Sequence, residues 1–460
     1  MNAKSIVALI SVTLFAAIST AEETRAPVES TTLFTNVNVF DGSTDALRMD
    51  CNVLIANNRI VEVCSTSTEA DTVIDGQGRT LMPGLIDGHV HFNFMVESGV
   101  LGLETKTWEE IGAMAVYGAQ EWLKNGFTTV RDMCGMNDGL RSTIDKGFIA
   151  GPRIYLSGAC ISQTTGHGDF RFKTQSDHYA TNVGRLGLTR LVDGRAEVLK
   201  GTRDNFANGA DYIKIMISGG VSSEKDPLHA TQFFDDEIRA AVEVAESFDS
   251  YVAAHVYQDH LIDRGLDLGI KVFDHAQMIS EKTLRKLKKQ DAYISPNTIG
   301  MTSYLSQHPV YGNPHTPVGA KTLDFQAQTK DLFEHLRKVK PKILFNTDIV
   351  FTQGEALRAG IDYQKWHLAS EIGNFETLKS MTSTAGEVMG LTGKNNPYPG
   401  KLGVIEAGAL ADIILVDGNP LEDITVIGAR DKWFDAEPRG PEVDTINLIM
   451  KDGVIYKNTL

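Results

Sequence analysis

The two ends of the chain share one pattern, in which short runs alternate apolar and polar residues between turn residues. Such alternation predicts half-buried β-strands. The runs lie at residues 35–40 and 72–75 near the start, and at 411–416 and 446–450 near the end. Neither end has enough strands to bury a sheet face alone. We therefore expect one small discontinuous β domain, a β-sandwich built from residues 22–84 and 396–460.

Between these ends, short apolar runs alternate with stretches of helical periodicity, which is typical of parallel βα units. Helices are predicted at 108–125, 235–248 and 374–390. Eight runs are candidate strands, at 85–92, 128–133, 153–161, 212–218, 251–256, 272–277, 292–298 and 343–348. Eight strands predict an α/β fold with a closed (β/α)8 TIM barrel over residues 85–395. A doubly wound open sheet is the rival, but no glycine-rich phosphate loop follows the first strand.

The first residues differ from the rest of the chain. Lys4 gives a short positive start, residues 6–18 are apolar, and residues 19–21 are small. This pattern predicts a signal peptide at 1–21 that is cleaved after Ala21. The apolar run is too short to span a bilayer comfortably, and no cysteine follows it for lipid attachment. We expect a mature soluble protein that is periplasmic or secreted and has no membrane partner.

The formal net charge is −15 over 460 residues. A nucleic-acid partner needs a basic footprint, and the sequence offers none. The composition is otherwise that of an ordinary globular protein with enough apolar residues for a large core. We therefore expect a small-molecule substrate and no nucleic-acid partner.

Four cysteines are too few for a disulfide scaffold in a chain of this length. Cys51 and Cys64 lie on predicted strands that flank a two-residue turn, in a register that sets them opposite each other. A disulfide between them is one outcome in an oxidising compartment, although directly opposed cysteines strain the bond. We expect Cys134 and Cys160 to be buried as small apolar side chains.

Polar residues that could bind a metal lie in or at the ends of the candidate strands, where (β/α)8 barrels carry their chemistry. A barrel histidine is often a hydrogen-bonded core residue and an aspartate often caps a segment, so each alone has a structural interpretation. Residues i and i+2 of a strand share a face, so His89 and His91 can reach one ion. The full set is His89 and His91 on the first strand, Lys214 on the fourth, His255 on the fifth, His275 on the sixth and Asp348 on the eighth. Their corresponding positions favour a metal centre.

Lys214 is the decisive member of the set. It lies between Ile213 and Ile215 on a predicted central strand, where a buried charge is costly. Burial disfavours the ammonium form and leaves a nucleophilic amine. We expect Lys214 to capture carbon dioxide as a carbamate whose two oxygens bridge two metal ions. A structural ion pair is the alternative.

This set of residues resembles the binuclear pattern of the amidohydrolase superfamily of metal-dependent hydrolases. The flanking β strands and the segment 400–415 resemble that family as well. The resemblance implies two divalent ions, with zinc the default for these ligands and manganese or cobalt also suitable. By the resemblance, one ion takes His89, His91 and Asp348, the other takes His255 and His275, and carbamylated Lys214 bridges them with a hydroxide.

The chemistry that this resemblance implies agrees with general principles. Two divalent ions acidify one water near neutral pH, and one ion polarises the scissile carbonyl. Asp348 would accept the proton of the attacking hydroxide and pass it to the leaving amine. We therefore expect loss of Asp348 to harm turnover more than metal content.

Three segments, at 164–169, 219–221 and 255–257, are similar to the branch that contains prolidase-like dipeptidases, carboxypeptidases and ochratoxin-hydrolysing amidases. The resemblance implies that His167 and Tyr257 contact the substrate, beside Val221. An imidazole and a phenol can both donate hydrogen bonds to a carbonyl or carboxylate. The structural alternatives are a packed aromatic ring for Tyr257 and a loop residue for His167. The other histidines, His308 among them, are expected at the surface or in local hydrogen bonds.

The leading functional prediction is hydrolysis of an amide that releases an amino acid, as in a dipeptidase, a carboxypeptidase or an N-acyl amino acid amidase. An esterase, lactonase or organophosphate hydrolase is a second hypothesis, because the same hydroxide can attack an ester carbonyl or a phosphorus atom. Deaminase patterns usually lack the lysine on strand four. A non-catalytic scaffold is a third hypothesis, but a scaffold does not need six polar groups that are costly to bury. The long loops 222–231 and 302–322 suit a lid, and the resemblance implies a homo-oligomer.

Overall fold

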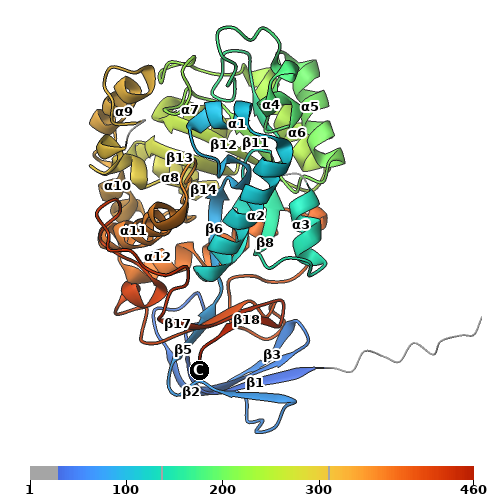
Figure 1. Ribbon diagram of the computed structural model, residues 1–460, viewed down its shortest axis with the longest axis vertical. Helices are drawn as coiled ribbons and strands as arrows, with labels where there is room; N and C mark the ends of the chain where they lie inside the picture. The colour runs from blue at the N-terminus through green and yellow to red at the C-terminus, as the bar shows by residue number, and fades with distance from the viewer. Residues whose placement is uncertain (1–29, 136–137, 309–310) are drawn as a thin grey trace, which may run out of the picture.

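The computed structural model describes residues 30–135, 138–308 and 311–460. The predicted signal peptide at 1–21 lies outside the described residues. Figure 1 shows a large α/β part, in which helices surround strands, above a smaller β part where the first and last strands of the chain lie together. Within the described ranges, no helix has the length and apolar character needed to cross a bilayer.

The smaller part is one eight-stranded sheet in the order β18-β17-β16-β5-β1-β2-β3, with β4 paired to β1. The two chain ends meet where β16 runs antiparallel to β5, so that Ile414 lies opposite Met82. This pairing agrees with a β unit made from both ends, while the two-sheet sandwich stays a prediction. The strands are β1 (Thr31–Val39), β2 (Arg48–Ala56), β3 (Arg59–Val63), β4 (Thr72–Asp75), β5 (Thr80–Pro83), β16 (Ile413–Val416), β17 (Ile446–Lys451) and β18 (Val454–Asn458).

The larger part holds two parallel sheets, β6-β7-β8 and β10-β9-β11-β12-β13-β14-β15. Each predicted run overlaps a strand, although the run at 343–348 does so only at Ile343. The run at 153–161 splits into β8 and β9, and a short extra strand, β10, pairs with β9. The strands are β6 (Leu85–Val90), β7 (Phe127–Asp132), β8 (Arg153–Leu156), β9 (Cys160–Ser162), β10 (Thr189–Leu191), β11 (Ile213–Met216), β12 (Val252–Gln258), β13 (Val272–Met278), β14 (Tyr293–Ser295) and β15 (Lys342–Ile343). The fold is therefore α/β and TIM-barrel-like.

The last predicted strand is much shorter than expected. β15 covers only Lys342–Ile343. The backbone that follows hydrogen-bonds to β6 instead, since Gly88 N donates to Phe345 O over 2.9 Å and Asp348 N donates to His89 O over 2.9 Å. These bonds hold Asp348 beside His89, on β6, and His91, just after it.

The helices surround the strands. The helices predicted at 108–125 and 235–248 agree closely with α2 and α6. The prediction of one helix at 374–390 is wrong, because it breaks between α12 and α13, where the Ser380 and Met381 carbonyls accept hydrogen bonds from Phe345 N and Ile86 N. The α-helices are α1 (Gly99–Thr105), α2 (Trp108–Lys124), α3 (Asp138–Asp145), α4 (Asn182–Arg185), α5 (Arg195–Ala207), α6 (Asp235–Ser247), α7 (Asp259–Asp267), α8 (Glu281–Lys289), α9 (Pro317–Gln328), α10 (Leu332–Val339), α11 (Gly354–Ile372), α12 (Asn374–Ser380) and α13 (Ser383–Gly390). Short 3-10 turns lie at Phe92–Phe94, His178–Ala180, Ile299–Met301, Leu305–Gln307, Gly393–Asn395 and Ile424–Ile427.

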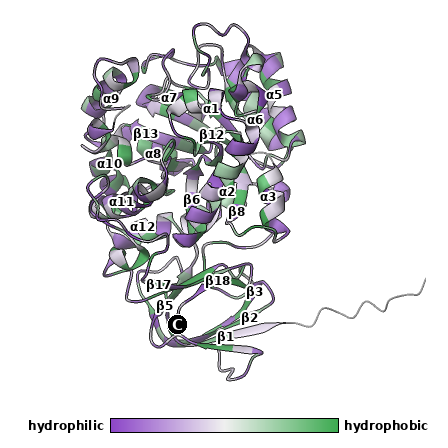
Figure 2. Cartoon of the chain, in the orientation of Figure 1, coloured by the Kyte–Doolittle hydropathy of each residue, from purple (hydrophilic) through white to green (hydrophobic). Residues whose placement is uncertain are grey.

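Hydropathy follows this architecture. Figure 2 shows hydrophobic residues along the strands and many hydrophilic residues on the outer helices. Helix α2 illustrates the reason, because it buries Ile111, Ala115 and Trp122 while Glu109 and Glu110 are exposed. The Trp122 indole donates a 2.8 Å hydrogen bond to Asp87, which fixes the helix against the strand that carries His89.

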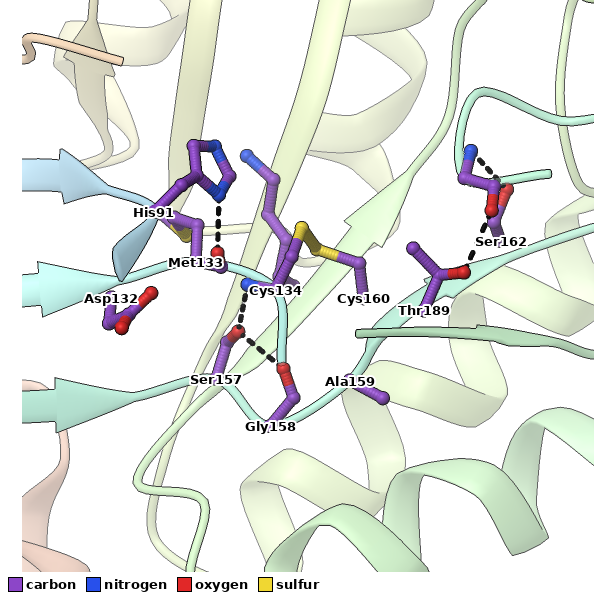
Figure 3. Close-up of a disulfide and its surroundings, with 12 residues drawn as sticks. His91, Asp132, Met133, Cys134, Ser157, Gly158, Ala159, Cys160, Ser162 and Thr189 are labelled. Carbon is purple, nitrogen blue, oxygen red and sulfur yellow. Dashed lines mark hydrogen bonds between the residues drawn. A yellow bond between two sulfur atoms is a disulfide. The ribbon is translucent and has the colours of Figure 1, made fainter. Parts of the chain in front are cut away.

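The structure contains two disulfides. Cys51 is bonded to Cys64, as the hairpin pattern allowed, although the β2–β3 pairing shifts by one residue between Leu54 and Ile55. Cys134 and Cys160 are both buried, as predicted, but they are bonded to each other instead of packing as separate side chains. A 3.0 Å hydrogen bond from Cys134 N to Ser157 Oγ brings the two segments together just beyond β7 and β8 (Figure 3). Sequence periodicity cannot detect such a pairing, because the two loops meet only in the folded chain.

Candidate metal centre and active site

Every residue that we predicted to bind metal or substrate lines one cavity at the C-terminal ends of the parallel strands. This is the end at which barrel enzymes carry their chemistry. The predicted residues in the cavity are His89, His91, His167, Lys214, Val221, His255, Tyr257, His275 and Asp348. His308, which we expected at the surface or in local hydrogen bonds, also lines this cavity.

His89 and His91 aim the same ring atom at the same point. Their Nε2 atoms lie 3.1 Å apart, and each lies within 3.5 Å of Asp348 Oδ1. The His91 Nδ1 atom faces the carbonyl oxygen of Met133 at 2.5 Å (Figure 3). A carbonyl only accepts, so Nδ1 carries the proton and Nε2 keeps its lone pair for a metal.

Asp348 joins the two histidines from the opposite side of the cavity. Its backbone has a φ of 48°, a left-handed conformation that is uncommon for aspartate and marks local strain. Asn297 Nδ2 donates to Oδ2 over 3.0 Å. Burial raises the pKa of Asp348, but the surrounding histidines outweigh this and hold the pKa well below its ordinary value. Asp348 is therefore an ionised, oriented carboxylate.

The other predicted ligands lie next to this group. The ring centroids of His255 and His275 are 4.6 Å apart, and His275 is 5.2 Å from His89. Burial lowers the pKa of His255 and of His275 well below the ordinary value, so both rings are neutral, the form that binds metal. Burial likewise lowers the pKa of Lys214. The Asp274 carboxylate, 2.5 Å from Nζ, opposes this shift and forms the ion pair that the sequence analysis gave as the alternative to a carbamate.

Asp274 is a member of the site that the sequence analysis missed. It is fully buried, and it contacts Lys214, the Nδ1 atom of His89 at 3.4 Å and the Arg131 guanidinium at 2.7 Å. Burial raises the pKa of Asp274, but the charges of Lys214 and Arg131 bring it well below the ordinary value. Strand alternation predicts that Asp274 and His275 point to opposite faces. The left-handed φ of 72° at His275 breaks that alternation, so both side chains reach the site.

His167 and Tyr257 lie beside the second pair of histidines. The His167 ring stacks on His255 at a centroid distance of 4.1 Å, and the Tyr257 ring lies 4.9 Å from His255. The backbone of Val221 hydrogen-bonds to Tyr257. Both side chains therefore border the space above the candidate metal ligands.

The rest of the cavity wall is mostly apolar and aromatic. It includes Phe94, Phe170, Leu305, Phe351 and Trp433. Trp433 comes from the segment between β16 and β17, which leaves the β sheet and reaches the α/β part, where the indole donates a 2.8 Å hydrogen bond to Ala356 O. The sequence carried no signal for this contribution, because the segment is far from every other cavity residue along the chain.

The donor set fits a metal centre. His89, His91 and Asp348 offer ligand atoms within 4.8 Å of one another. Neutral imidazoles with one carboxylate suit zinc and related divalent ions. His255, His275 and Lys214 offer a second group of nitrogen donors across the same cavity. The arrangement can hold one ion on the first group and accommodate a second beside it.

Comparison with known proteins agrees with this geometry. Residues 80–271 match the model of the Amidohydrolase family. The chain is 29% identical to the ochratoxinase of Aspergillus niger over 359 residues, which are 75% of this chain and 72% of that protein. Among solved structures, an amidohydrolase is 33% identical with a TM-score of 0.82, and a prolidase complexed with N-methylphosphonate-L-proline is 31% identical with a TM-score of 0.81. Each covers 94% of this chain, and the chain covers 100% of each.

Fold, cavity and comparisons together define a hydrolase that acts on carbon–nitrogen bonds. The chain belongs to the amidohydrolase family, in the branch that contains ochratoxinase and the prolidase-like dipeptidases.

Proposed function

We propose that this protein is an exported, binuclear metal-dependent amidohydrolase that cleaves an amide bond and releases an amino acid. Its substrate would be a dipeptide or an N-acyl amino acid. The observation that carries the proposal is the convergence of four histidines, Lys214 and Asp348 on one cavity with apolar walls. An apolar wall suits the acyl portion of such a substrate, and the polar floor suits its scissile amide.

One ion would be held by His89, His91 and Asp348, and the other by His255 and His275, with Lys214 between them. Two divalent ions, with zinc as the default, would supply an acidified water and polarise the scissile carbonyl. The hydrogen bond from His91 Nδ1 to Met133 O and the contact of His89 Nδ1 with Asp274 keep both rings oriented.

Lys214 would serve as a carbamate. Its neutral amine nitrogen adds to the carbon of carbon dioxide, a nitrogen–carbon bond forms, and the nitrogen releases a proton to solvent. The product would be an anion whose two oxygens could serve as metal ligands. The buried position of Lys214 and its lowered pKa support this step, because both favour the neutral amine.

Asp348 would move the proton during hydrolysis. It accepts the proton of the attacking water and delivers it to the nitrogen of the leaving amine, so that the carbon–nitrogen bond breaks as the amine departs. Asn297 holds the carboxylate for this transfer. Tyr257 would donate a hydrogen bond to the carbonyl or carboxylate of the substrate from above, and His167 would contact the substrate beside it.

Two further features belong to the proposal, the closure of the barrel and the export of the protein. We infer that β6, β7, β8 and β11 to β15 close into one barrel, supported by the hydrogen bonds from Asp211 N to Leu156 O and from Gly88 N to Phe345 O across the two seams. Export to the periplasm or beyond is supported by the two disulfides, because disulfides persist mainly in oxidising compartments.

Metal analysis followed by a substrate panel tests the function. We expect about two metals per chain, as the two groups of donors suggest, and hydrolysis of dipeptides or N-acyl amino acids that is lost in Lys214→Ala. A lactone and a phosphotriester belong in the panel, since turnover of these alone would favour an esterase or organophosphate hydrolase. A folded protein that binds no metal and cleaves nothing would overturn the proposal and favour a scaffold.

A further inference from the structure

His167 is held by a buried network that has no part in binding metal. Its Nδ1 atom lies 2.8 Å from Ser223 Oγ and 3.3 Å from Asp226 Oδ2. Ser223 Oγ also donates a short hydrogen bond to the Asp226 carboxylate. Ser223 and Asp226 are each only 1% exposed. The loop that follows β11 therefore places a carboxylate and a hydroxyl directly behind the His167 ring.

The direction of these hydrogen bonds fixes the proton on the ring. The Ser223 hydroxyl donates its hydrogen bond to Asp226, so the Ser223 oxygen accepts one from His167. An ionised carboxylate only accepts hydrogen bonds. Both neighbours of Nδ1 are therefore acceptors, and Nδ1 carries the proton. The opposite nitrogen, Nε2, has no hydrogen-bond partner among the described residues and belongs to a ring that lines the cavity.

Two further groups fix the network, a backbone N–H and a lysine. Gly220 N donates to Asp226 Oδ2 over 2.7 Å. Lys321, on α9, donates to Gly220 O over 2.6 Å and to Asp226 O over 2.7 Å, and its Nζ lies 3.4 Å from the Asp226 carboxylate. A single lysine thus joins α9 to the loop behind His167. Its charge also compensates the buried carboxylate, because Asp226 would otherwise be costly to bury.

Gly220 leaves just enough space for the ring. A Cβ atom at this position would lie 2.0 Å from Cε1 and 2.1 Å from Nδ1 of His167. On its other face the ring stacks on His255 with an angle of 18° between the planes. The imidazole is therefore confined between a glycine and a candidate metal ligand, and the contacts at Nδ1 set its rotation.

We propose that Asp226, together with Ser223, is a positioning residue that holds His167 with the Nε2 lone pair directed at a hydrogen-bond donor of the substrate, such as an amide N–H, above the metal centre. Lys321 fixes the loop that carries both residues. The proposal rests on the proposed amide hydrolysis for the identity of the substrate. It goes further by assigning a role to three residues outside the metal ligands and by making the loop after β11 part of substrate recognition.

A double-mutant cycle with Asp226→Asn and His167→Asn tests this role, on the dipeptide or N-acyl amino acid that the wild type cleaves fastest. We expect each single variant to raise KM about tenfold, with a smaller change in kcat and no loss of metal, as for a lost binding contact. In the His167→Asn background, Asp226→Asn should have no further effect on KM. Additive effects would mean that Asp226 acts on the fold alone and would overturn the proposal.

Three further variants keep the test decisive if Asp226→Asn does not fold. Ser223→Ala removes one acceptor from Nδ1 and should raise KM in the wild type but not in His167→Asn. Gly220→Ala forces the ring aside and should reproduce the KM of His167→Asn. His229→Gln, at an exposed position on the same loop, is the matched control and should leave both constants unchanged. Equal effects of Ser223→Ala with and without His167 would contradict the proposal.

Nitrogen-15 NMR of the histidine side chains separates this proposal from the proposed function. The Nδ1–H signal that disappears in His167→Asn should be present in the wild type and should shift or broaden in Asp226→Asn. If the wild type cleaves no amide, the proposed function fails while this readout still tests the positioning. An Nδ1–H signal that is unchanged in Asp226→Asn would overturn the positioning role.

Discussion

At the scale of single residues, the chemistry of the cavity depends on side chains that do not themselves face the substrate. Asp274 contacts a candidate metal ligand, the candidate carbamate lysine and a buried arginine at once. Such a partner orients the ligand ring and raises its basicity. The identity of the ligands is therefore only part of what determines metal affinity.

We expect Asp274→Asn to weaken metal binding about 10- to 100-fold, the usual cost of losing the residue that orients a ligand histidine. The substitution leaves the buried Arg131 guanidinium without its carboxylate partner and loosens the His89 ring. Metal content after dialysis against a weak chelator measures the effect. Asp236→Asn, at an exposed position on α6, serves as the control. Equal metal retention in both variants would contradict this role for Asp274.

The stability of the metal-free protein should fall as the pH decreases from about 6.5 to 4. Burial lowers the pKa of His89 to about 4, whereas the unfolded chain has its ordinary value of 6.5. In this window the unfolded state binds a proton that the folded state does not, so the free energy of unfolding decreases with falling pH, by about 3 kcal/mol for this group. Urea unfolding of chelated protein at several pH values measures the decrease. A decrease of the same size in His89→Asn would contradict the assignment to His89.

At the scale of elements, the two disulfides have different positions relative to the cavity. Cys51–Cys64 closes a hairpin of the β sheet. Cys134–Cys160 joins the segment after β7 to β9, and Cys134 directly follows Met133, whose carbonyl orients His91. The Cys51–Cys64 bond therefore supports the β sheet, while the Cys134–Cys160 bond supports the candidate metal site.

Replacing either pair by serine should destabilise the protein by about 2–4 kcal/mol, because each bond restricts the unfolded chain. Only the Cys134→Ser, Cys160→Ser variant should also lose metal affinity, since it frees the backbone at Met133. Urea unfolding and metal titration of the two double variants give the comparison. Equal metal affinity in both would contradict a link between the second disulfide and His91.

At the scale of the whole molecule, the β sheet and the α/β part are held together by buried charges. Arg153, at the start of β8, lies 2.8 Å from Asp412, directly before β16, and 2.6 Å from Asp452, in the turn before β18. Arg153 and Asp412 are both buried. The neighbouring carboxylates raise the pKa of the Arg153 guanidinium despite its burial. The ends of the chain are thus tied to the strands that carry the site.

We expect Arg153→Met to lower the free energy of unfolding by about 3–5 kcal/mol, because it leaves the Asp412 carboxylate buried without its partner. Lys401→Met, which breaks an exposed pair with Glu406, should change it by less than about 1 kcal/mol. Urea unfolding of both variants checks the contrast. A similar small change in both would mean that the Arg153 pair does not hold the two parts together.

The sequence by itself predicted the alternation of strands and helices, the pairing of strands from the two chain ends, the family and a group of residues that line one cavity. These features have local signals, since a strand places His89 and His91 on one face and parallel strands end at one edge. Periodicity failed where tertiary contacts replaced local bonds, as in the short β15 and in the break between α12 and α13.

Only the tertiary structure decided which distant residues complete the site. The Cys134–Cys160 bond, the contact of Asp274 with Arg131, the network behind His167 and the position of Trp433 each join segments that are far apart along the chain or that depart from strand alternation. No periodic pattern marks them, because backbone strain at His275 and loop packing around Gly220 arise only when the chain is folded. The local pattern therefore determined the chemistry available to this protein, and packing determined how that chemistry is oriented.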